Sequence, residues 1–211
     1  MNTYTSTHSQ NTATATLFPM EHDENLAAPL RLPHISELGY WYEYVPEGKR
    51  KELGIERNDH QRRGYNLVWQ FKNAHTAATQ HVARLVADEL RERFDADTLA
   101  SLVFCAVPAH NEDTTRRRLD SFSDMVCRLT GMKDGTPHVH VMGNAPAKHV
   151  TGIAAKGSAW HADCHIFAYK NVVIFDDVTT TGDTARTFAD FIGRHKGSVM
   201  GAYYLAKTII F

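Results

Sequence analysis

Two short segments of this 211-residue chain are apolar without interruption, Leu102–Val107 and Val172–Phe175. A strand that is apolar at every position has both faces buried, which is typical of the centre of a parallel sheet covered by helices. Segments in which apolar residues recur at helical spacing alternate with these runs. This alternation predicts an α/β fold built on a parallel sheet.

The elements on the C-terminal side of Leu102 follow the same alternation. A helix is expected where Leu119, Phe122, Met125, Val126 and Leu129 form one face, with Gly131 as its stop. After it the patterns predict a short strand, a helix and a final strand, over His138–Met142, Thr184–His195 and Val199–Ala206.

The region before Leu102 is expected to begin with two strands. Two segments, Leu38–Val45 and Tyr65–Phe71, are rich in β-forming aromatic residues and could pair as strands. The charged segment 47–63 is expected to form a loop between them. Helical spacing begins near Asn73, a plausible N-cap. The first 16 residues hold almost no large apolar side chains, so we expect a flexible tail, placed at 1–30, and a single domain over 31–211.

Bulk properties exclude several classes of protein. The net charge is −1 with the histidines neutral, so nothing points to nucleic acid or to an acidic membrane as a partner. Three scattered cysteines form neither a disulfide framework nor a CxxC pair, which favours a reducing, cytoplasmic location. The sequence shows no signal peptide and no apolar stretch of membrane-spanning length.

The segment Val172–Thr184, VVIFDDVTTTGDT, combines features that suit a phosphorylated sugar. A buried strand delivers Asp176 and Asp177 to its carboxyl end, the edge at which open α/β sheets bind ligands. The hydroxyl-rich turn that follows contains Gly182, which permits close backbone approach. A helix then begins, and its free N–H groups can hold phosphate. The segment does not fit a P-loop, an Asp-x-Asp phosphatase motif or a GxGxxG dinucleotide motif.

This string resembles the signature of type I phosphoribosyltransferases, which bind phosphoribosyl pyrophosphate (PRPP). The resemblance implies a Rossmann-like parallel-sheet core with a small N-terminal hood, here about residues 38–71. It implies that Asp176 and Asp177 hold the ribose hydroxyls, act in catalysis and bind Mg²⁺ directly or through water. It assigns the 5′-phosphate to the loop Thr179, Thr180, Thr181, Gly182, Asp183 and Thr184. Asp183 departs from the small or neutral residue common there, and we expect it to point away or to cap the helix.

Other parts of the resemblance are looser and favour the ComF-like branch of the family. The loop Pro108, Ala109, His110 and Asn111 would hold pyrophosphate, with Arg116, Arg117 and Arg118 adding charge or forming a solvated helix start. Lys148 and Lys156 lie where relatives carry a mobile catalytic loop, and a cation there would neutralise charge on departing pyrophosphate.

The resemblance implies transfer of the phosphoribosyl group from Mg-PRPP to a nitrogenous base, with release of pyrophosphate. Trp41, Tyr42, Tyr44 and Trp69 would stack on the base or form the core of the hood. The alternative is a non-catalytic protein that binds PRPP or a nucleotide, as a regulator or as a ComF-like accessory to DNA uptake. A homodimer is the commonest form of assembly.

A second cluster, His161, Asp163, Cys164 and His165, has spacing that zinc ligands can adopt. However, Cys164–Tyr169 has the pattern of a strand, which would send Cys164 and His165 to opposite faces. We therefore favour structural or surface histidines over a zinc site.

Overall fold

The computed structural model describes residues 36–142, 159–163 and 165–209. Five strands form a sheet in the order β1-β7-β6-β2-β3, and every neighbouring pair in it is parallel. These strands are β1 (Glu37–Tyr44), β2 (Val103–Ala106), β3 (Lys133–Asp134), β6 (Asn171–Thr179) and β7 (Ser198–Thr208). The expected α/β fold with a parallel sheet is confirmed.

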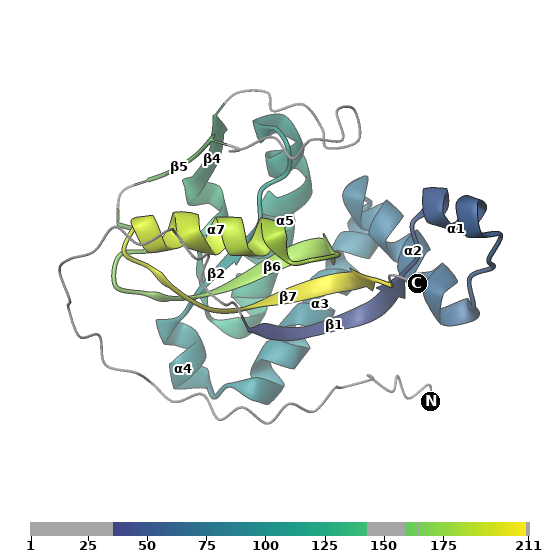
Figure 1. The fold of residues 1–211 in the computed structure, drawn as a ribbon. Helices are drawn as coiled ribbons and strands as arrows, with labels where there is room; N and C mark the ends of the chain where they lie inside the picture. The colour runs from purple at the N-terminus through teal and green to yellow at the C-terminus, as the bar shows by residue number, and fades with distance from the viewer. Residues whose placement is uncertain (1–35, 143–158, 164, 210–211) are drawn as a thin grey trace.

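Helices cover both faces of this sheet, as Figure 1 shows for α3 and α7 on opposite sides of β6 and β7. One core joins side chains of α3 and α5 to Phe104, Val173, Phe175 and Leu205. The other joins α7 to Cys105, Val172, Ile174 and Tyr204. The helices are α1 (Glu47–Leu53), α2 (Asp59–Lys72), α3 (Thr76–Arg93), α4 (Ala96–Ser101), α5 (Glu112–Thr130) and α7 (Asp183–Arg194).

The predicted strand over 65–71 is wrong, because these residues belong to α2. A capping box starts this helix: the Asn58 side chain accepts the N–H of Gln61, and the Gln61 side chain accepts the N–H of Asn58. Gln61, Gly64, Val68 and Phe71 are then buried at helical spacing. The capped start and this buried face outweigh the aromatic composition that suggested a strand.

β1 therefore has a different partner from the predicted one, and pairs with β7 in the main sheet. The charged segment 47–63, predicted as a loop, holds α1 and the start of α2. Asn73 is not the N-cap of α3. It ends α2, where its side-chain amide donates to the Trp69 carbonyl at 2.8 Å, and α3 begins at Thr76. The assignment of 38–71 to a hood stays a prediction.

The elements after Leu102 were predicted more accurately. β2, α5, β6, α7 and β7 lie where the patterns placed them, and Gly131 ends α5 in the left-handed conformation with φ 79°. The strand predicted near 138–142 is β4 (Val139–Met142), preceded by a 3-10 turn, η1 (Thr136–His138). It lies outside the main sheet and pairs antiparallel with β5 (Ala159–Ala162).

The strand predicted over 164–169 is wrong for the residues described, His165–Tyr169. They form turns, and His165 and Tyr169 have positive φ angles of 79° and 59°. None of the described helices is both long and apolar enough to cross a membrane. The tail predicted at 1–30, and Lys148 and Lys156, lie outside the described residues.

Candidate functional site

The candidate site lies at the carboxyl edge of the sheet, where β6 continues four residues beyond its apolar run. The backbone of Asp176, Asp177, Val178 and Thr179 is still in strand conformation, and β6 pairs with β7 as far as Thr179 opposite Lys207. Because consecutive residues of a strand point to opposite faces, the two adjacent carboxylates diverge. The sequence places the two acids side by side, but the strand separates their environments.

Asp177 faces the α3/α5 side and lies between two cations. Its carboxylate forms an ion pair with the Lys72 ammonium at 3.2 Å and another with the Arg118 guanidinium. The Asp177 and Arg118 side chains are only 16% and 11% exposed. The Arg118 Nε is buried and has no hydrogen-bond partner among the described residues. These three residues, the Asp177 ion-pair cluster, tie β6 to α2 and α5.

Asp176 faces the α7 side and lies opposite Tyr204 of β7 in the strand register. Its Oδ1 accepts the N–H of Asp177 at 2.9 Å. Burial raises the pKa of the Tyr204 phenol to about 12, and the nearby Asp176 carboxylate adds to the rise. The tyrosine beside Asp176 is therefore neutral near pH 7.

A polar hollow of about 140 Å³ lies next to this tyrosine, between the end of β6 and the start of α7. We call it the β6–α7 hollow. It is lined by Glu37, Thr179, Thr180, Thr181, Gly182, Arg186, Tyr204 and Lys207. Gly182 turns the chain with φ 78°, and its carbonyl accepts the N–H of Arg186 at 2.9 Å as α7 begins. The turn thus directs the N-terminus of a 12-residue helix toward a hollow lined with hydroxyl groups.

Two cations line the β6–α7 hollow, and each has an acidic partner within the chain. Arg186 forms an ion pair with Asp183, whose carboxylate also accepts the Thr181 hydroxyl at 2.5 Å. The Lys207 ammonium lies 2.8 Å from the Glu37 carboxylate and 5.4 Å from the centre of the Tyr40 ring. The N-cap of α7 is Gly182, and Asp183 is the first residue of the helix.

Glu37, Tyr204 and Lys207 were not foreseen as site residues. They come from strands far from the motif in sequence, and only the pairing of β7 with β1 and β6 brings them to it. No local pattern in the chain encodes that pairing.

The predicted pyrophosphate loop, 108–111, leaves the carboxyl end of β2 beside β6, where the Val107 N–H donates to the Phe175 carbonyl at 2.8 Å. Asn111 caps α5 by accepting the N–H of Thr114 at 2.8 Å. The Ala109 N–H donates to the Thr115 hydroxyl at 3.0 Å, so this group is already engaged within the chain. The His110 and Asn111 side chains meet at 2.8 Å.

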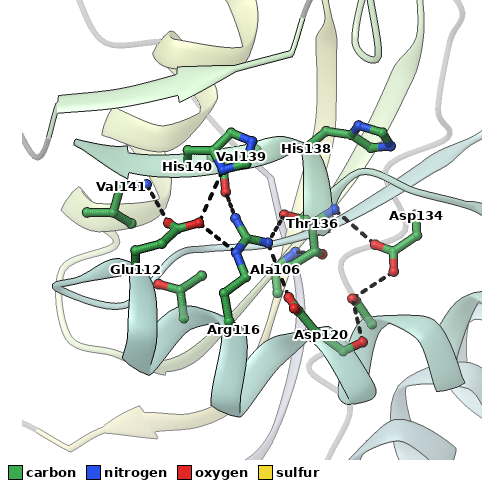
Figure 2. A network of polar contacts seen from close by, with 12 residues as sticks. Ala106, Glu112, Arg116, Asp120, Asp134, Thr136, His138, Val139, His140 and Val141 are labelled. Atoms are coloured by element: carbon green, nitrogen blue, oxygen red, sulfur yellow. Dashed lines mark hydrogen bonds and ion pairs between the residues drawn. The ribbon is translucent and has the colours of Figure 1, made fainter.

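The three arginines that follow this loop have separate surroundings. Arg118 belongs to the Asp177 ion-pair cluster, and Arg117 is exposed. Arg116 lies in the polar network of Figure 2, where it binds Glu112, Asp120 and the carbonyls of Thr136 and Val139. Glu112 also accepts the Val141 N–H at 2.7 Å and lies 3.1 Å from the His140 ring. Arg116 and Glu112 thus fasten β4 to the first turns of α5.

Side chains of the predicted His161/Asp163 cluster lie next to other histidines. Asp163 lies 3.2 Å from His138 and 3.5 Å from His140, contacts that become ion pairs when the histidines are protonated. His161 is opposite His140 in the register of β4 and β5. Among the residues that the structure describes, no group of three or more His, Cys, Asp or Glu side chains is arranged to hold a metal ion.

Comparison with known proteins gives a limited likeness. No family model and no curated protein matches the chain. Similar solved structures include an asparagine mutant from a study of an invariant aspartic acid in HPRTs, with 13% identity and a TM-score of 0.37, covering 66% of this chain and 76% of that one.

Two further structures are similar to the same degree. A hypoxanthine phosphoribosyl transferase of Trypanosoma cruzi has 14% identity and a TM-score of 0.36, over 66% of this chain and 74% of its own. A purine phosphoribosyltransferase from Pyrococcus horikoshii Ot3 has 15% identity and a TM-score of 0.35, over 67% and 87%. By its own structure the protein is a parallel-sheet α/β protein with a polar site at the carboxyl edge of the sheet.

Proposed function

We propose that this protein binds Mg-PRPP at the carboxyl edge of its sheet and transfers the phosphoribosyl group to a nitrogenous base. The observation that carries the proposal is the β6–α7 hollow, whose lining begins at Thr179, three residues after Asp176. A hydroxyl-rich turn, the start of α7 and two cations surround the hollow. A phosphate monoester needs hydrogen-bond donors and positive charge, and the turn and the two cations supply both. Ribose hydroxyls need an acceptor, which Asp176 supplies.

The two acids take different parts in this proposal. Asp176, on the side of the hollow, accepts hydrogen bonds from the ribose hydroxyls. Asp177 is held by Lys72 and Arg118 and acts as a positioning residue for this end of β6. The pyrophosphate would lie toward the loop 108–111, with Lys148 and Lys156 as the cations for its departure. Pyrophosphate leaves with the electron pair of its bond to the sugar carbon, and a base nitrogen bonds to that carbon and loses its proton to solvent.

Magnesium fits one of the two acids better than the other. Mg²⁺ keeps several waters and uses one or two carboxylates together with substrate phosphates, so it needs no cage of protein ligands. Asp176 suits this role, directly or through water. Asp177 already lies beside Lys72 and Arg118, so it does not suit a divalent metal ion as well. When bound, the metal would neutralise charge on the pyrophosphate oxygens.

Calorimetry with PRPP, with and without Mg²⁺, tests the binding half of the proposal. We expect Mg²⁺-dependent binding that Asp176→Asn weakens. A matched control is Asp190→Asn, which removes an acid from the last turns of α7, away from the hollow, where it pairs with Arg194. The absence of PRPP binding by the unmodified protein would contradict the proposal.

Pyrophosphate release from PRPP with a panel of bases tests the transfer half. Release that requires one base identifies the acceptor. Binding without release across the whole panel would overturn the transferase and favour a non-catalytic PRPP-binding regulator or a ComF-like accessory protein.

A further inference from the structure

The ammonium of Lys207 lines the β6–α7 hollow but is turned toward a partner within the chain. It lies 2.8 Å from one Glu37 carboxylate oxygen and 3.1 Å from the other, and the two residues are 170 positions apart in sequence. Both side chains are about two-fifths exposed, at 40% and 39%. The pair therefore lies in a region that solvent and a small anion can reach.

The two cations of the hollow differ in how they are held. Arg186 and its partner Asp183 lie one turn apart on the same helix, so the backbone keeps them close whatever binds nearby. Lys207 and Glu37 lie on different strands, β7 and β1, and lysine has a flexible four-carbon stem. Lys207 is thus the cation that can turn from one partner to another.

We infer that Glu37 is an internal competitor for the phosphate site, and that Lys207 exchanges the Glu37 carboxylate for the phosphate of the ligand when the β6–α7 hollow is filled. This rests on the proposed function, because it assumes that a phosphate occupies the hollow. It adds a determinant of ligand specificity, because a ligand must displace the Glu37 carboxylate from Lys207.

The preferred ligand follows from this exchange. A phosphate monoester above its second pKa, near 6, carries about two negative charges and three acceptor oxygens. It therefore outcompetes Glu37 for the lysine. A neutral sugar offers no charge and leaves the pair intact. The site is expected to select phosphorylated sugars in their dianionic form and to reject unphosphorylated ones.

A double-mutant cycle measured with ribose 5-phosphate tests the exchange on the full chain. Surface ion pairs contribute up to about 1 kcal/mol, so Glu37→Gln should tighten ribose 5-phosphate binding about three- to fivefold. Lys207→Met should weaken it by a similar factor or more. In the Lys207→Met background, Glu37→Gln should lose most of its effect, because the competitor acts through the lysine.

The control is Glu52→Gln, which removes an acid from a comparable exposed pair with Lys49 in α1 and should leave binding unchanged. Urea unfolding of each variant separates lost stability from changed affinity. If wild-type protein binds ribose 5-phosphate and Glu37→Gln leaves the affinity unchanged, or tightens it equally without Lys207, the inference is overturned and the proposed function stands. If the wild-type protein binds no ribose 5-phosphate, the phosphate site and the inference both fail.

Discussion

Asp176 and Asp177 are adjacent in sequence and opposite in surroundings. Asp177 is nearly buried and paired with Lys72 and Arg118 against the α3/α5 side of the sheet. Asp176 lies on the side of α7, opposite Tyr204, which lines the β6–α7 hollow. A carboxylate already matched by cations serves the fold first, whereas one beside an open polar hollow can serve a ligand. The role of a strand residue therefore depends more on the face to which its side chain points than on its residue type.

Removing Arg118 should produce the largest change in stability. Arg118→Met leaves Asp177 nearly buried with Lys72 as its remaining ion-pair partner among those described, and breaking a buried pair in this way costs about 3 kcal/mol of unfolding free energy. Urea denaturation measures the loss. Arg128→Met, in the same helix but with an exposed partner, Asp124, should cost less than about 1 kcal/mol. Equal losses for both variants would remove the distinction between the two acids.

For ligand affinity, in contrast to stability, Asp176 should matter more than Asp177. Asp176→Asn removes a charged acceptor from the ligand side, and hydrogen bonds to charged groups contribute about 1.5–3 kcal/mol, so PRPP affinity should fall about 10- to 100-fold. Asp177→Asn should lower stability more than affinity. Calorimetry and urea unfolding of both variants check the contrast. A larger loss of affinity for Asp177→Asn than for Asp176→Asn would reverse the roles.

Gly182→Ala tests the turn that shapes the hollow. An alanine at φ 78° is strained, and its Cβ would lie 3.3 Å from the Arg186 guanidinium, so we expect about 1 kcal/mol of destabilisation. Gly193→Ala in the same helix is the control, since its Cβ would meet nothing within 4 Å. That change should stabilise the protein by about 0.5 kcal/mol. Thermal unfolding of both variants shows whether Gly182→Ala lowers the stability and Gly193→Ala raises it.

Glu112 extends the comparison to a third acid at this edge. Partial burial acts to raise its pKa, but the Val141 N–H, Arg116 and His140 outweigh that effect and hold the pKa below its ordinary value of 4.5. Its contribution to stability is therefore complete above pH 4.5 and is lost as pH falls through the lower, folded-state pKa.

The corresponding variant is Glu112→Gln. At pH 7 it should be less stable than the wild type by about 1 kcal/mol, and the difference should shrink below pH 4. Urea unfolding at the two pH values measures it. A difference that grows on acidification would contradict the assignment.

The fold class could be predicted because fully buried strands leave a direct trace in sequence. Leu102–Val107 and Val172–Phe175 are apolar at every position, and the structure places both in the middle of the sheet. Tyr65–Phe71 misled because aromatic residues suit a half-buried strand and a half-buried helix alike. The deciding signal was the capping box at Asn58 and Gln61, several residues upstream.

The candidate site was foreseen in part for a similar reason. The turn after β6 is encoded locally, so its threonines and Gly182 could be singled out from the sequence. The divergence of Asp176 and Asp177 was missed because β6 runs past its apolar core to Thr179. Lys72, Glu37 and Lys207 approach the site only through tertiary packing, which no local spacing records. Arg118 could be named from the sequence, but its partner Asp177 could not.

The position of β7 between β1 and β6 has a consequence for how the protein is made. β1 is synthesised before β7, its only strand partner in the described sheet, and the Lys207–Glu37 pair spans 170 positions. At 5–20 residues per second, a ribosome needs about ten to thirty seconds to cover that span. During that time β1 has no strand of the described sheet with which to pair. Its aromatic segment, Tyr40–Tyr44, is then a natural target for chaperones, and nascent chains stalled before Ser198 should be the most prone to aggregate.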